Sequence, residues 1–233
     1  VIDIEGYLQA NKSDATLGEY TGEGGIWKRA EATTLYANWL AKQQTITLDK
    51  QGGEGGTNSI DVTYNEAMPN IEIPRRNGYE FAGYFVDASG TKKQYYDKDG
   101  KPLDKWKTPG NTTLYAKWTA TNYTITYNTN GGNSIAQKTY TIETATFALP
   151  TPTRTGYTFA GWYDNANLTG NKVTQVAKGS TGNKTFYAAW TINQYTLTYS
   201  AGEGGTVSGS HTSGTQIDYN TSVTLTANPA EGN

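Results

Sequence analysis

Cysteine is absent from the 233 residues, and histidine occurs once, as His211. The lack of cysteine excludes a disulfide framework, a thiolate zinc site and a cysteine nucleophile. A single histidine also lacks the partners that a nucleophilic triad or a histidine metal site requires. We therefore interpret His211, which lies in the polar stretch SGSHTSG, as a solvated loop residue, and we expect no catalytic residue, no metal site and no cofactor.

An excess of basic residues and a long apolar run are also missing. The formal net charge is −2, which argues against a nucleic-acid partner bound through a basic surface. No apolar run approaches the roughly 18 residues that a membrane-spanning helix needs. The first residues, VIDIEGYLQA, lack the charged start and the apolar segment of a signal peptide. We expect the targeting segments of a secreted parent protein to lie outside this sequence.

What the chain does contain is residue types that form strands and turns. It is rich in threonine and has 18 tyrosines and 27 glycines. Apolar and polar residues alternate three times, each time before a glycine-rich turn, at 44–48, 123–127 and 195–199. A second alternation follows the turn, through Ile60 and Val62 in the first copy. Two alternating runs across a Gly/Asn turn predict a hairpin, and no convincing amphipathic-helix pattern accompanies them.

A proline-led phrase occurs twice, as GYEFAGYFV at 78–86 and as GYTFAGWYD at 156–164. Proline cannot donate a hydrogen bond to a strand ladder, so the approach to each phrase is predicted to be a connection or an edge. The phrase itself is expected to continue as a strand. Its central glycine, Gly83 or Gly161, predicts a bulge or a close approach of another backbone.

A third landmark, TTLYANW, TTLYAKW or KTFYAAW, ends at Trp39, Trp118 or Trp190. The order of the landmarks predicts the second half of a repeat unit, two complete repeat modules and the first half of a further, divergent unit, at 1–40, 43–118, 122–190 and 193–233. The joints between units contain three or four residues and no Gly or Pro, which is too short for a loose tether. We expect an elongated array that is a fragment of a longer one.

These landmarks resemble the Listeria–Bacteroides repeat, also called the internalin B-repeat, in which a proline-led GYTFxGW is followed by tLYAkW. Residues 156–162 and 186–190 match closely, whereas 78–83 is followed by Tyr84 in place of tryptophan. The resemblance covers nearly the whole chain and departs at the degraded VIDIEGYL copy and the charged insertion 87–105. It implies tandem small β-grasp-like modules on bacterial cell-surface proteins, with spacer and adhesion roles. The expected fold class is therefore β-rich, and α+β by resemblance.

The recurring aromatic residues have two interpretations. In a small module without disulfides, large rings supply buried area efficiently, which favours a core role. The candidate core residues are Tyr36, Trp39, Gly83, Tyr115, Trp118, Phe159, Gly161, Trp162, Tyr187 and Trp190. The alternative is a stacking platform for sugars, for which the candidate ligand contacts are Trp27, Trp106 and Trp162.

Three further stretches resemble functional sites in part. The acidic stretch DKDGKPLD at 97–104 hints at calcium, but its glycine is fourth rather than sixth as in an EF-hand loop, so we interpret it as a hairpin turn. The stretch GGEGG at 52–56 lacks the lysine and the helix of a phosphate-binding loop. The acids of 87–104 have no counterparts in the other units, which argues against a glycosidase pair.

The sequence thus predicts a non-enzymatic extracellular array that acts as the stalk or spacer of a bacterial surface protein, with weak adhesion of its own. The alternative is a binding module that recognises a host glycoprotein or glycan. The half-units at 1–40 and 193–233 carry unpaired strand edges, so a further hypothesis is that complementary halves of different chains pair.

Overall fold

The computed structural model describes residues 43–108, 110 and 112–232. The predicted half-unit 1–40, with Trp27, Tyr36 and Trp39, lies outside the described residues. In the described part, the secondary structure consists of strands β1 to β15, and it includes no helix. The β-rich class is therefore confirmed, whereas the α+β class implied by the resemblance is not.

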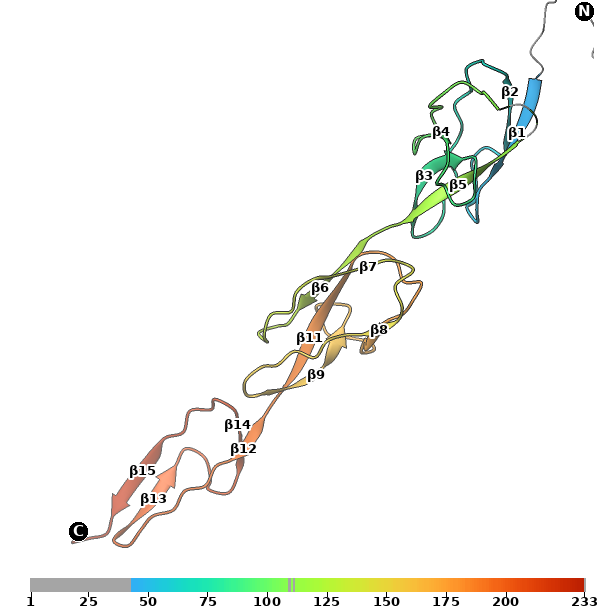
Figure 1. Cartoon of the computed structure of the whole chain (residues 1–233). Helices are drawn as coiled ribbons and strands as arrows, with labels where there is room; N and C mark the ends of the chain where they lie inside the picture. The colour runs from blue at the N-terminus through green and yellow to red at the C-terminus, as the bar shows by residue number, and fades with distance from the viewer. Residues whose placement is uncertain (1–42, 109, 111, 233) are drawn as a thin grey trace, which may run out of the picture. The chain divides into compact units, whose positions relative to one another are not determined.

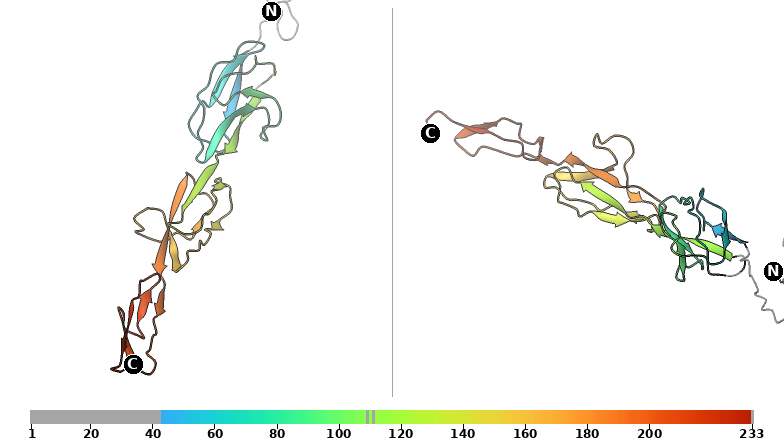
Figure 2. Two further views of the ribbon diagram at one scale, coloured as in Figure 1. Left: turned by 90° about the vertical axis from the view of Figure 1, so that its left-hand side faces the viewer. Right: turned by 90° about the horizontal axis from the view of Figure 1, so that it is seen from above.

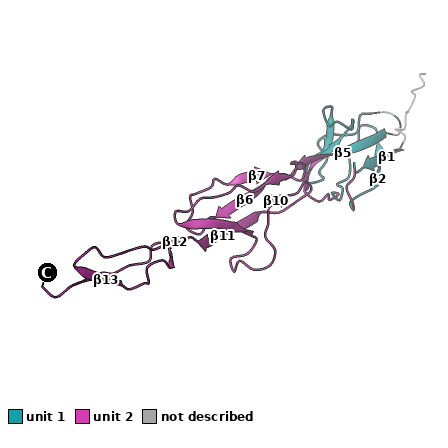
Figure 3. Ribbon diagram, turned by 90° about the horizontal axis from the view of Figure 1, so that it is seen from below, with its two compact units in different colours: residues 1–51, 56–73, 83–116 teal, residues 52–55, 74–82, 117–233 magenta. Residues whose placement is uncertain are grey.

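The chain divides into two compact units, which Figure 3 colours separately. Of the described residues, those within 43–51, 56–73 and 83–116 belong to unit 1, and those within 52–55, 74–82 and 117–232 belong to unit 2. The boundary therefore runs through the first repeat rather than between repeats. Residues 74–82, which include the first proline-led phrase, belong to the same unit as the second repeat.

The first repeat forms one five-stranded sheet with the order β2-β1-β5-β3-β4. Its strands are β1 (Gln43–Asp49), β2 (Ser59–Thr63), β3 (Tyr79–Phe85), β4 (Gln94–Tyr96) and β5 (Thr112–Ala120). The predicted hairpin is confirmed, because β1 pairs antiparallel with β2 and Ile46 lies opposite Ile60. β1 also pairs parallel with β5, with Leu48 opposite Leu114. Two further views in Figure 2 show the blue β1 beside the yellow-green β5.

The alternation of β1 explains which of its faces is buried. Ile46 and Leu48 are 0 % and 3 % exposed, while Thr45 and Thr47, which alternate with them, face solvent. Successive side chains of a strand point to opposite faces, so this threonine–aliphatic pattern produces one wet face and one packed face. Each fully buried aliphatic side chain contributes about 1.5–3 kcal/mol relative to leaving it in water.

The second repeat forms a four-stranded sheet with the order β7-β6-β11-β9. Its strands are β6 (Tyr123–Asn128), β7 (Lys138–Tyr140), β9 (Tyr157–Tyr163) and β11 (Lys184–Ile192), while β8 (Phe147–Ala148) pairs separately with β10 (Gln175–Val176). In Figure 1, β11 lies between β6 and β9. One face packs a cluster that includes Ile125, Trp162, Phe186 and Ala188.

Residues 193–232 form two separate two-stranded ribbons. β12 (Gln194–Thr196) pairs with β14 (Gln216–Asp218), and β13 (Gly205–Gly209) pairs with β15 (Leu225–Pro229). Figure 2 shows β13 and β15 side by side near the C-terminus. None of the described residues of this segment is buried.

The connection between the hairpin and the strand of the Gly-Tyr phrase contains no helix in either complete repeat. Residues 64–78 contain Pro69 and Pro74, and Asn65 has a positive φ of 63°. The matching connection of the second repeat contains Pro150 and Pro152. Proline removes a helical hydrogen bond and also disfavours the α conformation of the residue before it, so these stretches resist helix formation.

Candidate functional site

The Gly-Tyr turn of the first repeat contacts the second repeat, within unit 2. Gly78 has φ +76°, and a Cβ there would lie 2.6 Å from Ile142 Cδ1. Its carbonyl accepts a hydrogen bond from the N–H of Thr121 at 3.0 Å. The neighbouring Tyr79 hydroxyl donates to Glu143 Oε1 at 2.9 Å. Glycine is required here both by the left-handed backbone and by the side chain that covers it.

The same arrangement recurs one repeat later. Gly156 has φ +78°, and a Cβ there would overlap the ring of Tyr219. The Gly156 carbonyl accepts a hydrogen bond from Asn193 N–H at 2.9 Å, and Asn193 O accepts one from Tyr219 N–H at 2.8 Å. We call these two sites the Gly78 joint and the Gly156 joint. Each joins a Gly-Tyr turn to a residue that follows the last strand of the same repeat and to a side chain of the next repeat.

An arginine completes each Gly-Tyr turn. The guanidinium of Arg76 lies 4.2 Å from the ring centroid of Tyr79, and that of Arg154 lies 3.7 Å from the ring of Tyr157. In both turns the tyrosine N–H donates to the arginine carbonyl at 3.1 Å. Sequence analysis assigned these arginines no role, although an arginine precedes the tyrosine by three positions in both copies. The repeated spacing of arginine and tyrosine could have indicated this contact. A cation over an aromatic ring contributes about 0.5–1 kcal/mol at exposed sites.

The tryptophans that end the repeats lie over the glycine-rich turns. Trp190 Nε1–H donates to Thr129 O at 2.8 Å, and a Cβ on Gly132 would lie 2.5 Å from Trp190 Cζ2. Trp190 also packs edge-on against Phe159, with ring centroids 5.6 Å apart. Trp118 makes the matching contact with Phe81, also at 5.6 Å.

The other predicted core residues occupy positions of differing burial. Trp162 is 2 % exposed, while Phe159 and Trp190 are half-buried and pack against the cluster. Tyr115, Trp118 and Tyr187 are also half-buried. Gly83 and Gly161 have φ values of +131° and +132°. The β9–β11 pairing shifts register beside Gly161, between Ala189 and Trp190, as a bulge does. At Gly83, a Cβ would overlap the backbone carbonyl of Tyr96, which is the close backbone approach that the sequence pattern gave as the alternative.

The two described tryptophans proposed as ligand contacts present no ring face to solvent. Trp106 is 0 % exposed, packs on Tyr95 at 4.7 Å between ring centroids, and donates its indole N–H to Gln44 Oε1 at 3.1 Å. The Trp162 indole N–H donates to Pro150 O at 2.7 Å. Because the polar atom of each ring is already paired within the chain, we propose that both rings serve packing.

The charged insertion of the first repeat is organised by its own carboxylates. Asp97 Oδ1 accepts the N–H groups of Asp99 and Lys101 at 2.9 and 2.8 Å, as expected of a turn. Hydrogen bonds from Lys93, from the Lys105 N–H and from Lys107 lower the pKa of Asp104 to about 2. Among the described residues, no group of three or more His, Cys, Asp or Glu side chains gathers as metal ligands would.

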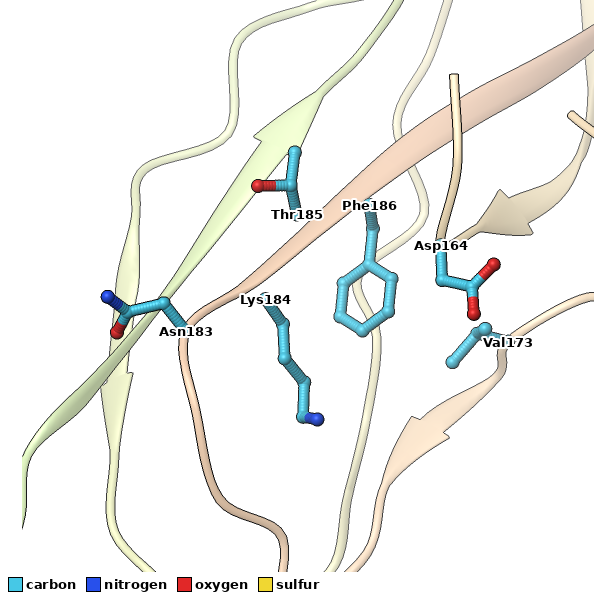
Figure 4. Close-up of a pocket in the computed structure, with 6 residues that line it drawn as sticks. All are labelled: Asp164, Val173, Asn183, Lys184, Thr185 and Phe186. Carbon is cyan, nitrogen blue, oxygen red and sulfur yellow. The ribbon is translucent and has the colours of Figure 1, made fainter. Parts of the chain in front are cut away.

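A shallow hollow of about 370 Å³ lies at the start of β11 (Figure 4). The Phe186 ring lies between Lys184 and the pair Asp164 and Val173, and the Thr185 side chain extends from β11 in the opposite direction to Phe186. One cation and one carboxylate on opposite sides of a ring provide neither an acid pair nor a nucleophile with its base. This hollow therefore offers no catalytic arrangement.

The sequence profile of the Listeria-Bacteroides repeat domain matches residues 45–117 and 123–189. The chain belongs to this family. Residues 195–233 match the profile of the divergent InlB B-repeat domain. The resemblance stated from the sequence is therefore confirmed. Thr121 and Asn193, which donate to the carbonyls of Gly78 and Gly156, lie between the matched ranges.

Curated relatives contain this stretch as a part of longer proteins. Internalin H of Listeria monocytogenes is 31 % identical over 156 residues, which is 66 % of this chain and 26 % of that protein. A candidate membrane protein of Evansella cellulosilytica is 26 % identical over 196 residues, which is 84 % of this chain and 27 % of the relative. The chain thus spans about a quarter of the length of these relatives. No solved structure matches it.

Within residues 43–108, 110 and 112–232, no helix is long and apolar enough to cross a membrane.

Proposed function

We propose that this chain is a non-enzymatic spacer of an extracellular bacterial surface protein, in which each Listeria-Bacteroides repeat is held to the next by a glycine joint. The recurrence of the joint is the observation that carries the proposal. The two Gly-Tyr turns are 78 residues apart in sequence. In each, the glycine carbonyl accepts a hydrogen bond from the N–H of the residue that follows the last strand of its repeat. A joint made from backbone hydrogen bonds and a covered glycine restricts bending, which is what a spacer requires.

Other observations support the same proposal. The relatives named above include an internalin and a candidate membrane protein, which favours a location at the bacterial surface. The burial of Trp106 and Trp162 favours packing over sugar stacking. The central parallel pair β1–β5, flanked by hairpins, supports describing each repeat as β-grasp-like although the described part has no helix. We retain residues 43–118 and 122–190 as the proposed folding modules.

The absence of cysteine makes the joint directly testable by spin labelling. Cysteines introduced at Ser59 and Thr169, both exposed, would carry one label in each complete repeat. We expect a narrow distribution of label-to-label distances in a double electron–electron resonance measurement. Insertion of two Gly-Ser pairs after Thr121, as the matched control, should broaden the distribution. A distribution equally broad with and without the insertion would refute the spacer proposal.

A further inference from the structure

The first and last strands of each complete repeat are paired with one another and run in the same direction. β1 pairs parallel with β5 in the first repeat, and β6 pairs parallel with β11 in the second. The chain enters each repeat at the start of the first strand and leaves it at the end of the last strand. In a parallel pair these two points lie at opposite ends, so tension on the chain pulls the two strands along one another.

Sliding of this kind loads the hydrogen bonds between the two strands together. Residues 46–49 of β1 lie opposite 112–115 of β5, and residues 125–128 of β6 lie opposite 184–187 of β11. A single backbone hydrogen bond contributes little net stability in water. A ladder whose bonds share the load must break as a unit, and it therefore resists a much larger force than one bond does.

Asparagine side chains extend the β6–β11 ladder beyond both of its ends. Asn183, directly before β11, accepts the N–H of Thr124 through its side-chain oxygen at 2.9 Å. Past the other end, the side-chain amide of Asn130 donates to Ala188 O at 2.7 Å. Each bond joins the first-strand side of the pair to the last-strand side, so both are strained when β6 slides along β11.

One face of the same ladder is closed to water. Ile125 on β6 and Phe186 on β11 are 0 % and 3 % exposed, and the rings of Tyr127 and Phe186 lie 6.5 Å apart between centroids. A hydrogen bond is stronger in such an apolar surrounding, and water that reaches a strained bond can replace it. Packing across the two strands therefore opposes their separation.

The described residues of 193–232 have the opposite geometry. Gly205 at the start of β13 lies opposite Pro229 at the end of β15, and Gln194 at the start of β12 lies opposite Asp218 at the end of β14. The chain thus enters and leaves each ribbon at the same end. Tension separates such a pair one bond after another, so we expect these ribbons to open at low force.

We propose that each complete repeat is a force-bearing module, in which the parallel first and last strands keep the repeat folded while the chain is under tension. We call the pairs β1–β5 and β6–β11 the strand clamps. The proposal rests on the spacer function, because a spacer transmits force between the parts that it separates. β5 ends at Ala120 and β6 begins at Tyr123, so tension passes from one strand clamp to the next through two residues.

The lack of cysteine allows the direction of the force to be chosen. Asn122→Cys and Thr191→Cys, both at exposed positions, attach handles at the start of β6 and near the end of β11, which loads the clamp by sliding. Asn122→Cys and Lys184→Cys attach them at the same end, because Lys184 lies opposite Ile125. Each full chain is pulled in optical tweezers at one loading rate.

We expect the second repeat to break at a force about twofold higher or more when the strands slide than when they are separated from one end, because forced unfolding is governed by the unfolding barrier along the pulled direction. Equal rupture forces in the two directions would overturn the proposal.

A matched pair of asparagine variants tests which bonds carry the load. Asn183→Ala removes the bond to Thr124 and should make the sliding chain unfold about fivefold faster at constant force. Asn165→Ala, also at an exposed position, removes side-chain bonds to Thr169 within one loop and should unfold at the unmodified rate. Equal rates of the two variants would show that the ladder does not bear the force.

A third variant keeps the test available where Asn183→Ala fails to fold. Asn130 has a φ of 47°, a conformation that glycine adopts readily, so Asn130→Gly removes the bond to Ala188 without straining the turn. It should also speed unfolding under a sliding load. An unchanged rate would contradict the role of the asparagine bonds.

Failure of the clamp and failure of the spacer are distinguishable. Equal rupture forces together with a narrow label-to-label distance distribution would refute the clamp and leave the spacer in place. A twofold difference in force together with a broad distribution would refute the rigid joint and support the clamp, since its hydrogen bonds lie within one repeat.

Discussion

The second repeat and the segment that follows it use the same local motifs with different results. Both contain an alternating strand, a glycine-rich turn and a paired return strand, as in β6–β7 and β12–β14. The second repeat buries Ile125, Trp162 and Phe186, each 3 % exposed or less. In 193–232 the large side chains of Tyr195 and Leu225 are 53 % and 49 % exposed.

The comparison shows which strands of a repeat are needed to form a buried core. The hairpin alone leaves one apolar face uncovered, and a two-stranded ribbon is marginally stable in water. The second repeat also contains β9 and β11, and these strands supply Trp162, Phe186 and Ala188 to the cluster. The described part of the divergent segment contains neither strand. The divergent segment nevertheless contacts Gly156 as closely as the second repeat contacts Gly78. A segment can therefore form a joint without having a core of its own.

The largest effect should come from removing the central ring of the core. Trp162 contacts Tyr127 and Phe159 at ring-centroid distances of 5.4 and 5.6 Å. Trp162→Ala should therefore lower the free energy of unfolding of the second repeat by about 3–5 kcal/mol. Urea unfolding followed through NMR signals of the second repeat measures this loss. A decrease below about 1 kcal/mol would mean that the cluster is not what stabilises the repeat.

The joint itself is the next test, and the chain offers a matched control. Gly156→Ala places a methyl group against Tyr219, whereas Gly170→Ala meets nothing within 4 Å. Their φ values of +78° and +84° are similar, so both variants incur about 1–2 kcal/mol of left-handed strain. Only Gly156→Ala should also release residues 193–232 from the joint.

Hydrogen exchange distinguishes the two variants. The Asn193 amide, bonded to Gly156 O at 2.9 Å, should lose protection in Gly156→Ala and retain it in Gly170→Ala. Similar protection in both variants would show that the close approach of Tyr219 does not hold the joint together.

Features that depend on neighbouring residues in the sequence could be predicted, whereas contacts between distant residues could not. The alternation of QTITL and YTITY predicted β1 and β6 because side-chain direction in a strand is a local property. Gly83 and Gly161 indicated a bulge or a close backbone approach for the same reason, since a positive φ is a property of one residue. Strand β4 was missed because its Tyr95 and Tyr96 lie in a charged insertion whose composition resembles a loop.

The joints could not be read from the sequence, because Gly78 and Ile142 come together only through the folding of both repeats. The sequence pattern assigned no role to Gly78 or Gly156, because the side chain that covers each of them belongs to a later part of the chain.

A smaller effect, confined to the folded core, is expected at alkaline pH. Burial raises the pKa of Tyr127, and burial together with Tyr123 raises that of Tyr140. The folded state therefore keeps phenolic protons that the unfolded chain releases near pH 10. The contribution of these protons to stability is complete below pH 10 and is lost as the pH rises through the folded-state values.

Urea unfolding of the second repeat between about pH 8 and pH 11 measures this loss. We expect the unfolding midpoint to fall over the upper part of this range. Tyr127→Phe keeps the ring and removes one titrating group, so the fall should be shallower in that variant. An identical fall in the variant would assign the pH dependence to other groups.

The smallest effect should come from the segment without a core. The Tyr195 side chain is 53 % exposed and packs against Tyr219 with ring centroids 6.4 Å apart. Truncation at such a surface position changes stability by about 0.5 kcal/mol or less. Tyr195→Ala should therefore leave the unfolding of the second repeat unchanged, although Tyr195 holds the place in its strand that Tyr123 holds in β6. If the variant instead destabilised the second repeat by more than about 1 kcal/mol, the packing of residues 193–232 on the Gly156 joint would extend through Tyr219 into that repeat, and the two segments would fold as one unit.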